Sequence, residues 1–172
     1  MPNQIEYCLK HAHGMVDMVL VDDHLIVNTQ GVGLADRLRT IDVELSQLKN
    51  FCLVPTIGAQ NVISRHGQDG EMEFDTAYDA EFIFSYLLGT RVKKKRVFVN
   101  SHNDDFQAIL SELLAKRPDA SLLDLPPAEA QKQIGVMSAR KAVYIIVFLL
   151  VGVPLIIALI IILTQALGGY KR

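Results

Sequence analysis

The chain has 172 residues, a net charge of −2 and a hydrophobic content of 50%, which is enough for one modest domain and an appendage. All 19 Asp and Glu lie at or before Glu129 with 12 of the 17 Lys and Arg, so the first 129 residues carry −7 and the remaining 43 carry +5. Because such an acidic domain repels nucleic acid and anionic lipid on average, nucleic acid is excluded as an expected partner.

The N-terminal segment, residues 1–14, is polar and has no charged and apolar regions like those of a secretory signal peptide. We therefore expect the following domain to stay in the cytoplasm, where Cys8 and Cys52 are reduced thiols. His11 and His13, with Cys8 nearby, have a spacing that matches no zinc pattern. No metal site and no cofactor are predicted.

The next part of the chain predicts antiparallel strands. Residues 16–21 and 24–29 are β-branched runs on either side of Asp22-Asp23, which suits a hairpin turn. Residues 35–55 have an apolar spacing that predicts a strand, a short turn and another strand. Residues 58–73 contain three Gly and few aliphatic side chains, and they form the longest predicted loop.

The clearest predicted hairpin covers residues 80–100 and bends at Gly89-Thr90. Just after the bend, five bases occupy six consecutive positions: Arg91, Lys93, Lys94, Lys95 and Arg96. These bases are the candidate binding site for a protein partner or for anionic lipid headgroups. The competing interpretation is that they form only the solvated tip of the hairpin, where charges are least costly.

An amphipathic helix is predicted next, with Ser101 or Asn103 as its N-cap and Pro118 just after its end. Its apolar stripe would cover an open face or end of the sheet.

Residues 119–141 contain two adjacent prolines and are interpreted as a stalk, which reaches about 75 Å when fully extended. Within it Leu122, Leu123 and Leu125 form an apolar cluster that needs a surface. We expect this cluster to pack back on the domain, and contact with a partner subunit is the alternative.

Residues 142–167 predict a single transmembrane helix, followed by a short polar tail at 168–172. They contain no charge, and 18 of these 26 residues are Leu, Ile, Val or Phe; a helix of that length is about 39 Å long and crosses a bilayer core of ~30 Å. Gly152 and Pro154 predict a kink near Leu150 and close approach of another helix. The expected anchors at the membrane interface are Arg140, Lys141, Tyr144, Tyr170, Lys171 and Arg172.

The order of these elements resembles the pleckstrin-homology-like (PH-like) fold in its divergent and bacterial forms. The resemblance covers about residues 15–118 and is carried by "MVLVDDHLIVNT", "IDVELSQLKNFCLV", "EFIFSYLLG", "KKKRVFVN" and "DDFQAILSELLAK". It implies an α+β class: a mainly antiparallel, two-sheet β-barrel that is capped by one C-terminal helix and binds lipids, peptides or proteins. In lipid-binding members, headgroup-binding bases flank the first hairpin turn, which here looks like Asp22-Asp23 and has no base nearby. The resemblance therefore does not imply phosphoinositide binding at that turn.

No phosphate-binding Gly-rich loop, nucleophile elbow or metal-ligand helix motif is present in the sequence, so no enzyme activity and no catalytic residue is predicted. We expect a non-catalytic, tail-anchored, single-pass membrane protein whose cytoplasmic PH-like domain binds a protein partner. It would act as an accessory or scaffold subunit of a membrane complex, or self-associate. The alternatives are a lipid-headgroup-sensing adaptor that uses bases 91–96, and an enzyme without a recognisable motif.

Overall fold

The protein is described by a computed structural model that places residues 4–11, 14–31, 38–56, 65–66, 72–73, 78–137 and 144–168. The chain divides into two units, Met1–Ile134 and Gly135–Arg172, and each is described by itself. The first unit contains two antiparallel sheets with helices, and the second contains one long apolar helix. The predicted α+β class is confirmed at this level.

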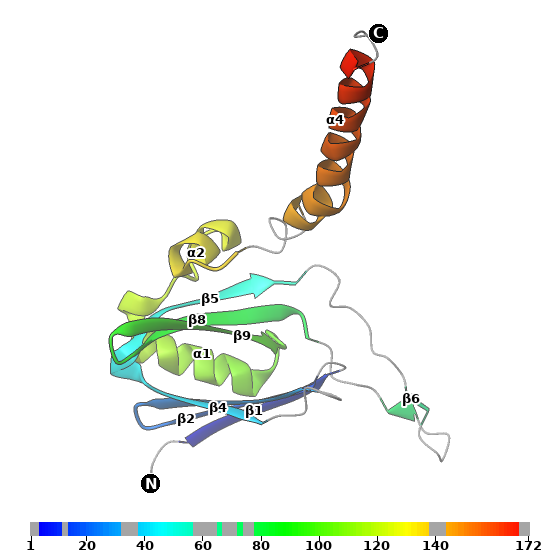
Figure 1. The fold of residues 1–172 in the computed structure, drawn as a ribbon. Coiled ribbons are helices and arrows are strands. Elements are labelled where there is room, and N and C mark those ends of the chain that lie inside the picture. The colour runs from blue at the N-terminus through cyan, green and yellow to red at the C-terminus, as the bar shows by residue number, and fades with distance from the viewer. Residues whose placement is uncertain are drawn as a thin grey trace. The chain divides into compact units, whose positions relative to one another are not determined.

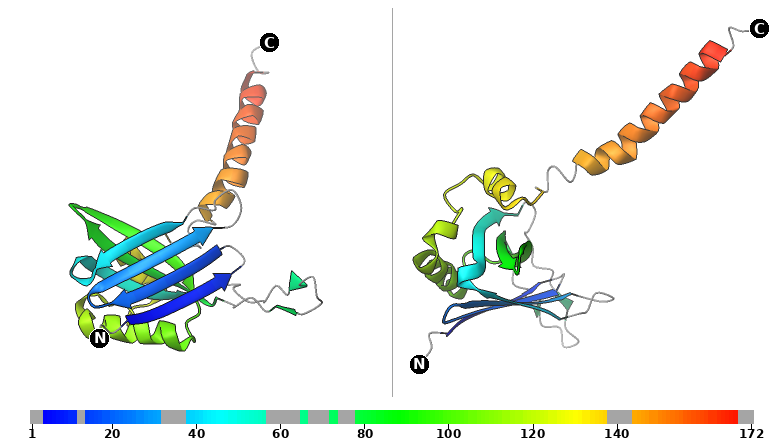
Figure 2. Two further views of the ribbon diagram at one scale, coloured as in Figure 1. Left: turned by 90° about the horizontal axis from the view of Figure 1, so that it is seen from below. Right: turned by 60° about the vertical axis from the view of Figure 1, so that its left-hand side comes forward.

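The first sheet has four strands in the order β1-β2-β3-β4, each antiparallel to its neighbour (Figure 2). The strands are β1 (Gln4–His11), β2 (Gly14–Val21), β3 (His24–Gly31) and β4 (Arg39–Glu44). Alternate residues point into the core, as Val16, Met18 and Leu20 of β2 show by their burial. The predicted hairpin at Asp22-Asp23 is confirmed and joins β2 to β3.

Strand β1 was not predicted, because residues 1–14 are polar and were expected to form a segment before the domain. Instead, Gln4–His11 pair along their whole length with β2. Only Tyr7 and Leu9 of this strand are buried core residues, so the strand has a polar sequence. The first hairpin therefore joins β1 to β2, and Asp22-Asp23 is the turn of the second hairpin. The absence of bases near Asp22-Asp23 therefore gives no argument against headgroup binding at the first hairpin turn, because Asp22-Asp23 is a different turn.

The second sheet has three strands in the order β5-β8-β9. They are β5 (Leu48–Pro55), β8 (Ala80–Leu88) and β9 (Arg91–Val99). A 3-10 turn, η2 (Leu45–Gln47), links β4 to β5, which confirms the predicted strand, turn and strand. The hairpin at Gly89-Thr90 is also confirmed, and Gly89 has the positive φ of 62° that glycine allows without strain.

The longest predicted loop contains a small ladder of two strands, β6 (Arg65–His66) and β7 (Met72–Glu73). The other residues of 58–73 lie outside the described residues.

Helix α1 (Asp104–Lys116) lies between the two sheets at one end of the domain (Figure 1). Asn103 is its N-cap, because its Oδ1 accepts hydrogen bonds from the backbone N–H groups of Asp105 and Phe106 at 2.9 and 3.1 Å. The ring of Phe106 lies 5.3 Å from that of Tyr7 and 5.8 Å from that of Phe82, so it packs against both sheets. The helix thus completes the core at the end that the sheets leave open.

The predicted stalk is largely part of the domain. The short helix η3 (Pro118–Ala120) leads to a segment beside β5, where the Leu122 N–H donates to the Phe51 carbonyl at 2.9 Å. Helix α2 (Pro127–Ile134) then packs on β5 and β8, with Ala130 and Ile134 buried.

This arrangement leaves fewer residues between the domain and the second unit than the predicted stalk. The expected return of the leucine cluster to the domain is confirmed for Leu122 and Leu123, which pack on it, whereas Leu125 is partly exposed. The stalk prediction is wrong up to Ile134, since residues 135–143 alone separate α2 from the C-terminal helix. Fully extended, this link spans roughly 30–35 Å instead of 75 Å.

The second unit is helical from Tyr144 to Gly168, and its segment Tyr144–Thr164 has a mean hydropathy of 3.4 and no buried residue. These 21 residues span about 31 Å, which matches a bilayer core. Within the described residues this is the one helix long and apolar enough to cross a membrane. Of the expected interface anchors, Tyr144 begins the helix, and Arg140, Lys141, Tyr170, Lys171 and Arg172 lie outside the described residues.

The middle of this helix is irregular. A π-helical turn, η4 (Phe148–Gly152), precedes α4 (Val153–Gly168), in which Pro154 is the second residue. The ring of Phe148 lies over Gly152, so that a Cβ at that glycine would be only 2.9 Å from Phe148 Cδ2. The helix therefore fills the space beside Gly152 with its own side chain, and close approach of another helix there is not supported. The kink stays a prediction.

Candidate functional site

The five predicted bases are spread along β9, so that Arg91 and Lys93 lie near the bend of the hairpin and Lys95 and Arg96 lie further along the strand. In the register with β8, Lys95 lies opposite Phe84 and Lys93 opposite Tyr86, on the face that carries the core rings. Arg96 lies opposite Ile83, on the other face. Because side chains alternate along a strand, the run divides between two faces of the sheet.

The inner face of the domain changes from apolar to basic toward one end. Along β9, buried Val97 is followed at the next inward position by Lys95. Along β4, buried Val43 and half-buried Ile41 are followed by Arg39. Polar side chains at inward-facing strand positions oppose the pattern that builds a core, and are expected mainly where they have a function.

These positions surround an open hollow of about 330 Å³ between β9 and the ends of β1 to β4. Its basic side chains are Arg39, Lys95, Arg96 and His11, and its polar and apolar lining includes Thr29, Met15, Val16, Val97 and Phe98. No Asp or Glu is among the described residues that line it. A concave site with several bases and no acid favours a negatively charged ligand.

Lys95 is the central cation of this hollow. Its Nζ donates a hydrogen bond to Thr29 Oγ1 at 2.9 Å, so its partner is neutral. Burial lowers the pKa of Lys95, and the nearby charge of Arg39 lowers it further. Lys116 is different, because its hydrogen bond to the Asp23 carboxylate raises its pKa. Among the residues that the structure describes, no acid pairs with Lys95, and an anion in the hollow would supply that charge partner.

The other two basic groups of the hollow, Arg96 and His11, interact with neighbouring side chains. Arg96 forms an ion pair with Glu81 at 3.5 Å. The His11 ring lies edge-on to the rings of Tyr78 and Phe98, with centroids at 5.4 and 5.5 Å. Arg39 and Lys95 are therefore the two groups best placed to bind an anion.

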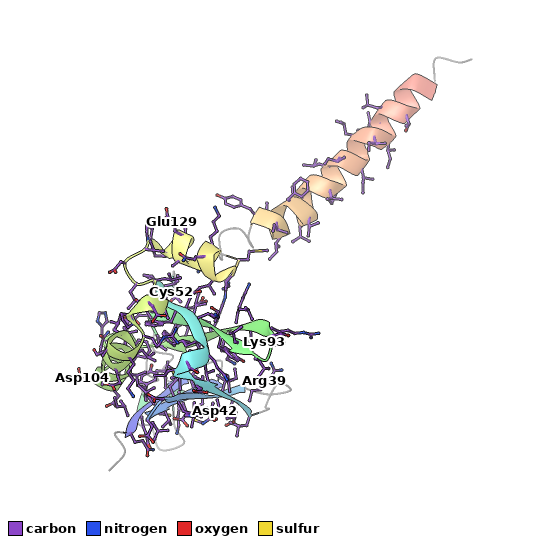
Figure 3. The ribbon with its side chains drawn as sticks, turned by 90° about the vertical axis from the view of Figure 1, so that its left-hand side faces the viewer. Arg39, Asp42, Cys52, Lys93, Asp104 and Glu129 are labelled. Carbon is purple, nitrogen blue, oxygen red and sulfur yellow. The ribbon has the colours of Figure 1, made fainter. Side chains whose placement is uncertain are left out.

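The distal half of the basic run lies outside the hollow. Arg91 and Lys93 are exposed and form no ion pair with any residue that the structure describes. Two apolar side chains beside them, Leu88 and Val92, are 59% and 53% exposed. Lys93 extends away from the body of the domain (Figure 3).

Other sites considered from the sequence gain no support. Among the described residues, no group of three His, Cys, Asp or Glu side chains comes together, and His13 lies outside them. The predicted absence of a metal site stays a prediction.

Comparison with protein-family models, curated proteins and solved structures finds no match to this chain. The PH-like resemblance stays a prediction, and the site has to be interpreted from its own geometry.

Sequence reasoning found Lys95 and Arg96 but missed Arg39, Thr29 and His11. The sequence does contain a sign of two of these residues. Thr29 and Arg39 each continue a row of alternate apolar residues, on β3 and β4, at a position where an apolar side chain would be expected. The register places Thr29 opposite both Val16 and Arg39, and this cannot be known from the sequence before the strands are paired.

Proposed function

We propose that the protein is a non-catalytic, single-pass, C-terminally anchored adaptor whose cytoplasmic domain is a divergent PH-like domain. The domain holds an acidic segment of a protein partner in the hollow and keeps that partner at the membrane. The observation that carries this proposal is the pair of inward-facing cations, Arg39 and Lys95, in a hollow without a described acid. No catalytic role is proposed.

A peptide suits this hollow better than a bare anion does. Met15, Val16 and Phe98 add apolar surface to the cationic lining, so an acidic side chain and its apolar neighbours can be bound together. Strand β9 is also the edge of its sheet, and an exposed edge can pair with an extended peptide strand. One peptide could then pair with the backbone of β9 and also contact the side chains of that strand that line the hollow.

Attachment to a membrane fits the role of an accessory or scaffold subunit. The helix Tyr144–Thr164 is long and apolar enough to span a bilayer, and residues 135–143 hold the domain close to it. A tether of roughly 30–35 Å raises the effective concentration of the domain near other subunits of a membrane complex.

A lipid headgroup in the hollow is the second candidate. It is favoured by the position of the hollow at the end of the first hairpin, where His11 and Met15 line it. A headgroup uses the same two cations but needs neither the apolar lining nor the free edge of β9.

Photo-crosslinking separates these candidates. A photoreactive amino acid at Met15, in the full chain within its native membrane, should form an adduct with one protein. Mass spectrometry should locate that adduct in an Asp- and Glu-rich segment. The variant Arg39→Gln with Lys95→Gln should lose most of the adduct, whereas Arg91→Gln with Lys93→Gln, the matched pair outside the hollow, should retain it. An adduct with lipid alone would support the second candidate, and no adduct above that of a probe at Leu114 would contradict both.

A further inference from the structure

The end of the β8–β9 hairpin combines exposed apolar and basic side chains. We call Leu88, Arg91, Val92 and Lys93 the β8–β9 tip. Leu88 pairs with Arg91, and Val92 pairs with Leu87. The apolar side chains Leu88 and Val92 therefore lie on opposite faces of the hairpin.

Both faces of the tip present apolar surface to solvent, so no single flat contact would cover it. Leu88 and Val92 are each more than half exposed, and leaving such side chains in water is unfavourable. An end-on insertion covers both at once. It also places Arg91 and Lys93 level with a charged surface, since long basic side chains extend back along the hairpin.

The hairpin that carries the tip is basic, although the domain as a whole is acidic. Residues 82–103 contain no Asp or Glu, although the first 129 residues carry −7 in total. At physiological salt, charges act over about 10 Å or less. A surface that meets the tip end-on therefore meets Arg91 and Lys93 on a stretch of hairpin, within residues 82–103, that itself carries no acid.

We propose that the β8–β9 tip docks end-on into the anionic leaflet that faces the domain, in the bilayer that the chain's own C-terminal helix crosses. This inference rests on the membrane anchoring in the proposed function, but not on what occupies the hollow. The link of residues 135–143 keeps the domain near the leaflet, so that even a weak contact is largely formed. Two bases near an anionic surface strengthen such a contact on the order of 10-fold or more.

Tryptophan fluorescence tests this contact directly, because the chain contains no Trp. The variant Leu88→Trp of the full chain is reconstituted into nanodiscs that contain brominated phosphatidylcholine, with or without phosphatidylserine. We expect a blue-shifted emission that the brominated lipid quenches when phosphatidylserine is present. High salt should remove most of the quenching. The variant Leu114→Trp, on α1, is the matched control and should show little quenching in either lipid.

Charge variants connect the quenching to the tip. Adding Arg91→Gln and Lys93→Gln to Leu88→Trp should remove most of it, whereas adding Arg39→Gln and Lys95→Gln should leave it unchanged. Equal quenching at positions 88 and 114, or none at 88 in anionic nanodiscs, would overturn the proposal. The two experiments use different variants. A negative fluorescence result would therefore contradict docking of the tip but not the partner site in the hollow. A negative crosslinking result would contradict the partner site but not docking of the tip.

Discussion

At the scale of single residues, the unusual feature is Lys95, which occupies an inward-facing position of β9 where an aliphatic side chain would be expected. Lys95 faces the core, hydrogen-bonds to a hydroxyl and has a lowered pKa. A group whose pKa falls on folding favours its neutral form and so opposes folding below that pKa. The domain tolerates this cation at the edge of its core, and a bound anion would reverse the shift.

Gly14 gives a prediction at the same scale. It has a φ of 145°, and a Cβ there would lie 2.0 Å from the Gln30 carbonyl oxygen. Gly14→Ala therefore forces β2 and β3 apart and should lower the free energy of unfolding by roughly 2–4 kcal/mol. Urea denaturation followed by circular dichroism measures this.

Gly89 is the matched control, since a Cβ there has nothing within 4 Å and meets only the strain of a φ of 62°. Gly89→Ala should cost about 1–2 kcal/mol. If both alanines cost the same, the close contact at Gly14 would not be the cause.

At the scale of elements, α2 belongs to the domain and covers its second sheet. Ile83 and Ser85 are buried although they lie on the face opposite the core rings of Phe82 and Phe84. Helix α2 packs on β5 and β8 and accounts for this burial. Strands β5 and β8 therefore have cover on both faces, which agrees with the nearly continuous hydrophobic run of β8.

Shortening a buried side chain at the end of α2 tests whether this helix stabilises the domain. Ile134 is 4% exposed, so Ile134→Ala should destabilise the domain by about 2–4 kcal/mol in urea denaturation. Leu125→Ala, at a residue that is 36% exposed, should cost less than about 1 kcal/mol. A free stalk would instead give no loss for either variant.

The elements also show how far the sequence can predict this fold. The β2–β3 and β8–β9 hairpins and α1 were predicted correctly, because turn residues and apolar periodicity mark them locally. Strand β1 has only two buried side chains, and the cover by α2 depends on a distant sheet, so neither has a strong local signal. The hollow was missed for the same reason, since Thr29 and Lys95 lie 66 residues apart.

At the scale of the whole molecule, the two cysteines allow the proposed orientation to be tested. Cys8 is exposed and Cys52 is buried, where burial raises the pKa of the Cys52 thiol to about 11. A thiol with so high a pKa is almost entirely protonated near neutral pH and reacts slowly with maleimides. A membrane-impermeant maleimide should therefore label Cys8 alone.

With the domain in the cytoplasm, intact cells should show no labelling until they are permeabilised. Cys8→Ser should abolish the signal that then appears, which identifies the labelled residue. Strong labelling of Cys8 on intact cells would place the domain on the other side of the membrane.

In the proposed membrane-anchored protein, the packing of residues 118–134 on the domain limits how far the domain can lie from the bilayer. A stalk would allow a search through a deep layer of cytoplasm, but residues 135–143 permit an excursion of only roughly 30–35 Å beyond the last residue of α2. A partner site high above the membrane would be out of range. The proposed function therefore favours partner segments that lie close to the lipid surface.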